Sequence, residues 1–162
     1  FPGQGSMGAC LKKLSENDLR DALIFSLKNL PFLGICLGLQ ILFSESEESE
    51  DEKGLGIFPE KIKKFSEFKD RTIKIPHMGW NQVEFSQSHF IWEGLESSKD
   101  FYFVHSYASK EIDEKYIYSK TFHGESFNSA VAKDNIFATQ FHPEKSGKSG
   151  LNLLQNFIDW KI

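Results

Sequence analysis

Cys36 lies between two glycines, at the point where an apolar run gives way to a helix-compatible pattern. Residues 31–40 read PFLGICLGLQ. A residue at such a strand-to-helix corner has a strained backbone, and the positions two before and two after it must be small because strand and helix pass closely. Gly34 and Gly38 occupy these positions. The spacing predicts a nucleophile elbow whose helix N-terminus favours the thiolate. The alternative is an ordinary buried cysteine.

A cysteine nucleophile requires a base, and the base requires a group that orients it. Histidine is the usual base, and the chain has five: His77, His89, His105, His123 and His142. Only His142 follows a strand-like run and precedes a carboxylate by two residues, in His142-Pro143-Glu144. The rigid proline would fix the direction of both side chains, so that Glu144 could hold the ring tautomer. Alone this is more often a surface pair, but together with Cys36 it predicts a Cys-His-Glu triad.

Three helical stretches flank the two motifs. The first covers residues 7–14, the second follows a cap at 15–18 and ends before Pro31, and the third covers 150–162. Apolar spacing predicts core-facing stripes in the last two, at Leu19, Leu23 and Leu27 and at Leu151, Leu154 and Ile158.

A further helix should follow the elbow, from Leu37 to about Ser44. The acidic run at 45–52 should form a solvated loop. After Gly54 the pattern changes to short β-type segments separated by polar turns, at 56–59, 72–75, 101–104, 116–118, 129–132 and 136–141. This order of elements predicts an α/β sheet with an antiparallel extension.

The composition restricts the class of protein. The chain has 162 residues, 40% of them hydrophobic, which suits one domain with its own core. A net charge of −4 gives no basic footprint for nucleic acid, and no apolar stretch is long enough to span a bilayer. The two cysteines, Cys10 and Cys36, make no disulfide framework. We therefore expect a cytoplasmic protein in which Cys10 serves packing.

Metal and phosphate sites are weaker interpretations. No cysteine, histidine or acidic residues have zinc-site spacing, so we expect no metal and no cofactor. The opening residues 1–6, FPGQGS, lack the Walker lysine and the full dinucleotide pattern. They suit a turn that points backbone N–H groups into a site. Because such a turn usually follows a strand, and the chain does not open with Met, we expect that structure upstream of residue 1 is missing.

Two segments, 34–40 (GICLGLQ) and 140–146 (QFHPEKS), resemble the class I (triad) glutamine amidotransferases. Within that family the glutaminase subunits of imidazole glycerol phosphate synthase are similar at 54–56 (GLG), 76–81 (PHMGWN) and 102–107 (YFVHSY). The resemblance runs in order along nearly the whole chain. It implies a flavodoxin-like mixed sheet flanked by helices, in a single amidotransferase domain over 1–162 that lacks its N-terminal strands.

The resemblance also implies roles for particular residues. Cys36 would be the nucleophile, His142 the general base and acid, and Glu144 the orienting carboxylate. Backbone N–H groups would form the oxyanion hole, at Leu37 and in the turn at Gln4 and Gly5. Four residues would hold glutamine, namely Gln40, Glu48, Ser106 and Tyr107. Four would face a partner subunit, namely Trp80, Asn81, Tyr102 and Lys145. Without the motif, Trp80 and Tyr102 would be assigned to core packing.

The implied reaction is hydrolysis of glutamine to glutamate and ammonia through a γ-glutamyl thioester. In such enzymes ammonia passes to a (β/α)8-barrel cyclase subunit, which forms imidazole glycerol phosphate and an aminoimidazole carboxamide ribotide in histidine biosynthesis. The resemblance thus implies a heterodimer, and the composition favours neither nucleic acid nor a membrane as a partner. Two alternatives remain open. One is a triad glutaminase serving another acceptor, such as a sugar-nucleotide amination enzyme, and the other is a non-catalytic binding module of the same fold.

Overall fold

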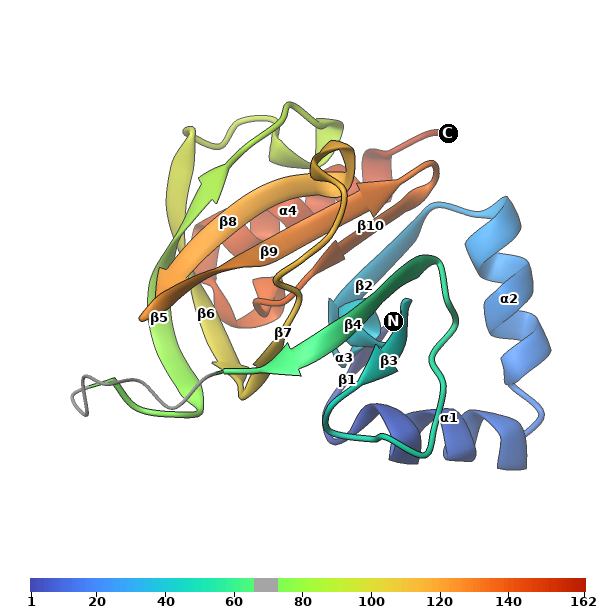
Figure 1. The fold of residues 1–162 in the computed structure, drawn as a ribbon. Coiled ribbons are helices and arrows are strands. Elements are labelled where there is room, and N and C mark those ends of the chain that lie inside the picture. Colours follow the sequence, from blue (N-terminus) through green and yellow to red (C-terminus); the bar gives the residue numbers. More distant parts are fainter. Residues whose placement is uncertain (66–72) are drawn as a thin grey trace.

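The computed structural model describes residues 1–65 and 73–162, which form a curled mixed β-sheet with helices beside and behind it (Figure 1). The main sheet has seven strands in the order β1-β2-β10-β9-β8-β5-β6. Along the chain these are β1 (Pro2–Gly3), β2 (Phe32–Cys36), β5 (His77–Phe85), β6 (Ser98–His105), β8 (Ile117–His123), β9 (Glu125–Lys133) and β10 (Ile136–Thr139). The predicted α/β class with an antiparallel extension is confirmed.

The sheet brings the two sequence motifs together. β1, β2 and β10 are parallel, and Ile35 of β2 pairs with Thr139 of β10. The elbow at Cys36 and the motif at His142 therefore follow the carboxyl ends of adjacent parallel strands, although they are about a hundred residues apart in sequence. From β10 onward every pairing in the sheet is antiparallel.

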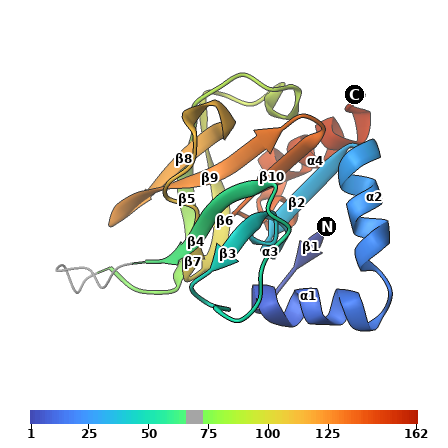
Figure 2. The same cartoon turned by 45° about the vertical axis from the view of Figure 1, so that its right-hand side comes forward.

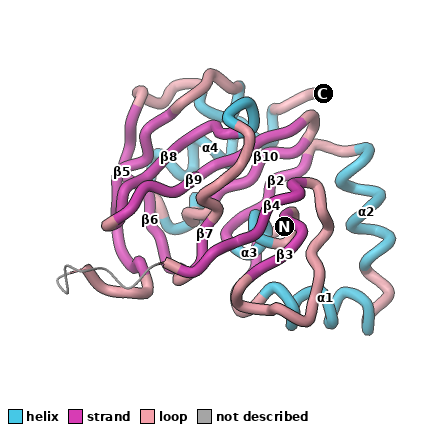
Figure 3. The backbone as a smooth tube through the Cα atoms, in the orientation of Figure 1, coloured by secondary structure: helices cyan, strands magenta, loops and turns pink. Residues whose placement is uncertain are grey.

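A smaller sheet and the helices surround this centre. The smaller sheet has the order β3-β4-β7, with β3 at Phe43–Ser46, β4 at Phe58–Lys64 and β7 at Tyr107–Ala108. The helices are α1 (Met7–Glu16), α2 (Arg20–Asn29), α3 (Leu37–Gln40) and α4 (Gly147–Asp159). Short 3-10 turns cover Phe90–Trp92, Glu114–Tyr116 and Pro143–Lys145. Figure 2 shows α1 and α2 beyond β2, and Figure 3 shows the strands gathered at the centre.

Successive side chains of the central strands point to opposite faces of the sheet, and each face contributes to one apolar cluster. Phe32 and Ile136 pack with α1, α2 and the smaller sheet. Leu33, Ile35 and Phe137 pack on the other side, with the aromatic residues of β6 and with α4. Because both faces of β2 and β10 are buried, the strands that carry the motifs are held rigidly.

The helix predicted from Leu37 to about Ser44 is wrong in its length. It ends at Gln40, and Phe43 instead begins β3, where it pairs with Phe58 of β4. The two phenylalanine rings lie 5.1 Å apart and are fully buried. Burial of Phe43 in a strand therefore outweighs the local helical pattern.

The core-facing stripe predicted for the last helix is wrong at two of its three positions, because Leu154 alone of the three packs against the core. Leu151 and Ile158 are 65% and 72% exposed, whereas Leu153 is fully buried. The reason is Gly150, where a Cβ atom would collide with the Pro143 carbonyl oxygen. Close approach at this glycine sets the buried face of α4. In α2, likewise, Leu23 and Leu27 are buried but Leu19 precedes the helix and is 52% exposed.

The β-segment predictions differ in accuracy. Those at 101–104, 129–132 and the first part of 136–141 lie within β6, β9 and β10, and those at 56–59 and 116–118 begin before their strands. Residue 72 of the 72–75 segment lies outside the described residues, and 73–75 are not in a strand. The sequence did not predict β5, because polar residues and Gly79 interrupt its apolar alternation.

Candidate active site

Cys36 occupies the corner between β2 and α3. Its φ of 54° and ψ of −101° lie outside the helical and extended regions, as in a nucleophile elbow. A methyl group at Gly34 would come within 2.6 Å of the Gly38 carbonyl oxygen, and one at Gly38 would collide with the Phe1 carbonyl oxygen. Both glycines are therefore required where strand and helix pass, as the sequence predicts.

The Cys36 thiol is buried and protonated at neutral pH. Burial raises its pKa to about 11, although hydrogen bonds from the Leu37 backbone N–H and the Gln140 amide oppose this rise. The Gln140 Nε2 atom lies 3.6 Å from Cys36 Sγ. The predicted preference for the thiolate is wrong for this state, because α3 is a single turn whose dipole does not offset the desolvation. A base must therefore remove the thiol proton.

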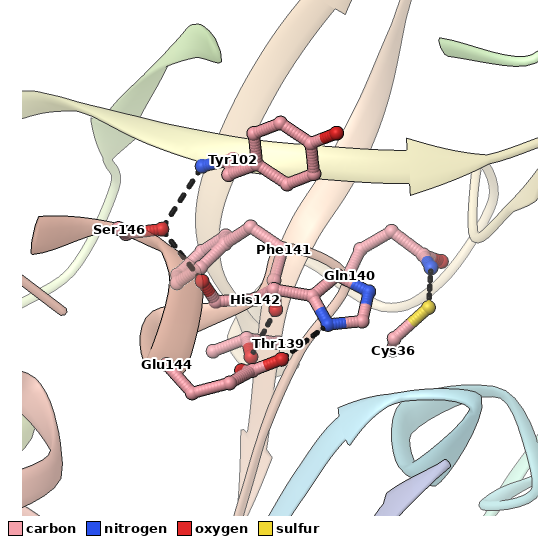
Figure 4. A network of polar contacts seen from close by, with 8 residues as sticks. All are labelled: Cys36, Tyr102, Thr139, Gln140, Phe141, His142, Glu144 and Ser146. Carbon is pink, nitrogen blue, oxygen red and sulfur yellow. Dashed lines mark hydrogen bonds and ion pairs between the residues drawn. The ribbon is translucent and has the colours of Figure 1, made fainter. Parts of the chain in front are cut away.

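The His142 imidazole is oriented as such a base. Its Nδ1 atom lies 2.7 Å from Glu144 Oε1. Because a carboxylate accepts, Nδ1 carries the proton and Nε2 of the neutral ring keeps a lone pair. Among the described residues Nε2 has no hydrogen-bond partner, although it is buried. In Figure 4 the ring lies between Glu144 and Cys36.

Backbone contacts with β6 hold the histidine in place. The His142 N–H donates to the Tyr102 carbonyl at 2.9 Å. The Tyr102 N–H donates to Ser146 Oγ at 2.9 Å, and this hydroxyl donates to the His142 carbonyl at 2.6 Å. Figure 4 shows the two contacts of Ser146, and together with the His142 N–H bond they form a closed set of three that fixes where the imidazole leaves the backbone.

A cavity of about 520 Å³ contains Cys36 and His142 in its wall. Its volume suits a small metabolite. Most of the other predicted site residues line the same cavity: Gln4, Gly5, Leu37, Gln40, Glu48, Tyr102, Ser106, Tyr107 and Lys145. The structure thus brings together side chains and backbone from the N-terminal turn, the elbow, the acidic loop, β6 and the His-Pro-Glu motif.

The glycine-rich turn lies beside the nucleophile. β1 pairs with β2 so that Gly3 is opposite Cys36. Gly5 has a φ of 96°, a conformation that favours glycine. Since Gln4 and Gly5 both line the cavity, their backbone forms part of its wall. Donors at this position could stabilise a developing oxyanion.

Glu48 differs from the rest of the acidic run because it is tied to a helix N-terminus. Its carboxylate accepts from the Met7 backbone N–H, while partial burial raises the pKa of Glu48. The next residue, Ser49, accepts from the Gly8 N–H at 3.0 Å. These contacts hold the loop against α1, so that Glu48 faces the cavity.

The predicted partner-facing residues divide into two pairs. Tyr102 and Lys145 line the cavity, and the Lys145 Nζ atom lies 5.8 Å from the centre of the Tyr102 ring. Trp80 and Asn81 lie outside it, on β5. Trp80 is 58% exposed and contacts the Tyr102 ring edge to face at 6.3 Å. Core packing, the alternative for Trp80, is therefore wrong.

Two polar residues of the site had no role in the sequence analysis, although both lie in the quoted motifs. Gln140 contacts Cys36, and His105 lines the cavity. Gln140 could have been found as an uncharged polar residue directly after an apolar strand. His105 gave no such signal, because its buried partners come from other strands.

The described residues contain no group of three or more histidine, cysteine and acidic side chains placed to hold a metal ion. None of the helices in this part of the chain is long and apolar enough to cross a membrane.

Residues 2–160 match the family model for glutamine amidotransferase class-I. The chain is 50% identical over 165 residues to an imidazole glycerol phosphate synthase subunit HisH from Nitrosospira multiformis, covering 99% of this chain and 77% of that protein. It is 48% identical over 164 residues to the HisH subunit from Nitrosomonas europaea, covering 98% and 77%.

Similarity to solved structures supports the same fold. A crystal structure of a glutamine amidotransferase superposes with a TM-score of 0.67 and 19% sequence identity, over 96% of this chain and 76% of that one.

Proposed function

The chain belongs to the class I glutamine amidotransferase family, and on this premise we propose that it is the glutaminase subunit of an imidazole glycerol phosphate synthase. It hydrolyses glutamine to glutamate and ammonia. The ammonia passes to a (β/α)8-barrel cyclase subunit in histidine biosynthesis, in the cytoplasm, and residues 1–162 belong to one amidotransferase domain.

One observation carries the chemistry. His142 combines a 2.7 Å contact from Nδ1 to Glu144 with an Nε2 atom that has no partner in the described part of the chain, in the wall of the cavity that contains Cys36. This arrangement suits a base that takes a thiol proton and returns it to a leaving group.

The reaction proceeds in two halves. His142 Nε2 takes the Cys36 proton as Sγ attacks the side-chain amide carbon of glutamine, and the C=O electron pair moves onto oxygen. Backbone N–H groups at Leu37 and in the Gln4–Gly5 turn hold that oxyanion. As it collapses, the C–N bond breaks and the imidazolium gives its proton to departing ammonia. Water, activated by the same imidazole, then hydrolyses the thioester and restores the thiol.

Glu48 and β7 hold the amino acid end of glutamine. The Glu48 carboxylate pairs with the α-ammonium group, and backbone donors near Ser106 and Tyr107 meet the α-carboxylate. Gln40 lines the same cavity, with its Nε2 atom 3.1 Å from the Tyr107 carbonyl oxygen. The exposed Trp80, next to the cavity-lining Tyr102 and Lys145, forms part of the surface that meets the cyclase.

A covalent trap tests this function. A chloroketone analogue of glutamine should alkylate Cys36, which peptide mass spectrometry would locate, and Cys36→Ala should abolish glutamate release in the presence of the cyclase subunit. Production of imidazole glycerol phosphate in that mixture distinguishes the histidine pathway from another acceptor. Glutamate release that persists in Cys36→Ala would refute the mechanism, and an unlabelled Cys36 would favour a non-catalytic module.

A further inference from the structure

A chain of hydrogen bonds, separate from the triad, begins at the nucleophile. Gln140 Nε2 contacts Cys36 Sγ at 3.6 Å, and Gln140 Oε1 accepts from Gln40 Nε2 at 3.3 Å. The same Gln40 Nε2 atom donates to the Tyr107 carbonyl at 3.1 Å. Two amides therefore connect the thiol to the backbone that lines the glutamine end of the cavity.

These hydrogen bonds continue through two buried histidines to Asn81, which lies on the same face of β5 as His77. His105 Nδ1 lies 3.0 Å from the Tyr107 carbonyl oxygen, and His105 Nε2 lies 2.9 Å from His77 Nδ1. His77 Nε2 in turn lies 3.1 Å from Asn81 Nδ2, which also donates to the Phe122 carbonyl at 2.9 Å. The two rings are opposite each other because His77 and His105 pair across β5 and β6.

The donor and the acceptor are determined for every hydrogen bond between Tyr107 and Asn81. A carbonyl only accepts, so His105 carries its proton on Nδ1 and its Nε2 accepts from His77 Nδ1. His77 Nε2 is then an acceptor and requires a donor from Asn81. The Asn81 amide cannot turn over, because its Oδ1 accepts from the Gln82 backbone N–H at 2.8 Å.

The surroundings keep both imidazole rings neutral, which this arrangement of donors and acceptors requires. His77 stacks on Phe103 at 4.6 Å and on His123 at 4.1 Å, and His105 packs on Phe65 at 5.3 Å. Burial lowers the pKa of His77 and of His105 to about 3. Neither histidine belongs to the triad.

We propose that His77 and His105 are positioning residues of the glutamine site, which hold the Tyr107 carbonyl through a one-way chain of hydrogen bonds anchored at Asn81. These hydrogen bonds fix the backbone at Ser106 and Tyr107, and they join that backbone to Asn81 of β5 and the Phe122 carbonyl. Its kinetic consequence rests on the proposed glutaminase function, whereas the proton positions do not.

Nitrogen-15 NMR of the imidazole rings tests the proton positions directly. His77 and His105 should both be neutral tautomers with the proton on Nδ1. Single His→Gln variants assign the signals. A proton on Nε2 of either His77 or His105 would overturn the proposal, and this result does not depend on any activity.

Asn81→Asp tests the anchor, because it replaces the amide donor with a carboxylate of nearly the same volume. The new carboxylate only accepts, so a His77 ring that stays neutral must carry its proton on Nε2, and two acceptors then face each other between the histidines. With saturating cyclase subunit, KM for glutamine should rise by about tenfold while kcat changes by less than about twofold. Gln82→Glu makes the same charge change on the neighbouring residue and should leave both constants unchanged. An equal effect of the two variants would overturn the proposal.

His77 itself provides a second pair of variants. His77→Gln keeps an acceptor toward Asn81 and a donor toward His105, whereas His77→Leu keeps neither. We expect the KM of His77→Gln to stay within about threefold of the natural value and that of His77→Leu to rise by about tenfold or more. Equal KM values for the two variants would refute the one-way chain. If the unsubstituted protein also failed to hydrolyse glutamine, that result would instead count against the proposed function.

Discussion

The buried thiol of Cys36 should be unusually unreactive toward small electrophiles at neutral pH. With a pKa of about 11, roughly one molecule in 10⁴ carries the thiolate at about pH 7. An unperturbed thiol with a pKa of about 9 would have roughly one in 10². The more basic thiolate of Cys36 is intrinsically more nucleophilic by up to about tenfold. The net expectation is alkylation at least about tenfold slower than that of a free thiol.

The assay is competitive alkylation with iodoacetamide in the Cys10→Ser variant, where Cys36 is the one remaining thiol. A thiol peptide in the same tube serves as the internal standard, and mass spectrometry follows both. Because the folded pKa is raised, the rate for Cys36 should increase about tenfold per pH unit and continue to increase above the pH at which the peptide reaches its maximum.

A glutamine-analogue chloroketone provides the contrast. It should alkylate Cys36 at neutral pH faster than iodoacetamide does, because binding places it beside the unpartnered His142 Nε2 atom. The reasoning would be refuted if iodoacetamide modified Cys36 as fast as the peptide near pH 7. That result would mean that the thiolate is already favoured without a substrate.

Three further substitutions test separate parts of the structure. Glu144→Gln should lower kcat by about 10²- to 10⁴-fold, because an amide no longer fixes the imidazole tautomer, with an unchanged thermal melt; activity near the natural level would remove Glu144 from the triad. Gly34→Ala should destabilise the fold by about 2–4 kcal/mol in urea unfolding, since its methyl group meets the Gly38 carbonyl at 2.6 Å. Gly8→Ala is its control and should cost less, because its neighbours are side-chain atoms at 3.1 Å. Glu48→Gln should raise KM for glutamine about 10- to 100-fold with a smaller change in kcat, and steady-state kinetics showing the reverse pattern would place Glu48 elsewhere.

The sequence predicted the elements whose local pattern agrees with their tertiary environment. Residues 32–36 are apolar on both faces and form the central strand β2. The prediction from sequence failed where contacts with distant residues override the local pattern. Phe43 leaves a helical pattern to pair with Phe58, and Gly150 turns α4 so that Leu151 is exposed.

The same distinction applies to the candidate site. The sequence alone determined which residues could do chemistry, because the glycine spacing around Cys36 and the rigid His142-Pro143-Glu144 unit depend on backbone geometry within a few residues. Only the tertiary structure decided the protonation of that cysteine and the chain of hydrogen bonds through His77 and His105. Both depend on desolvation and on partners from strands far apart in the chain, and no local pattern of residues encodes them.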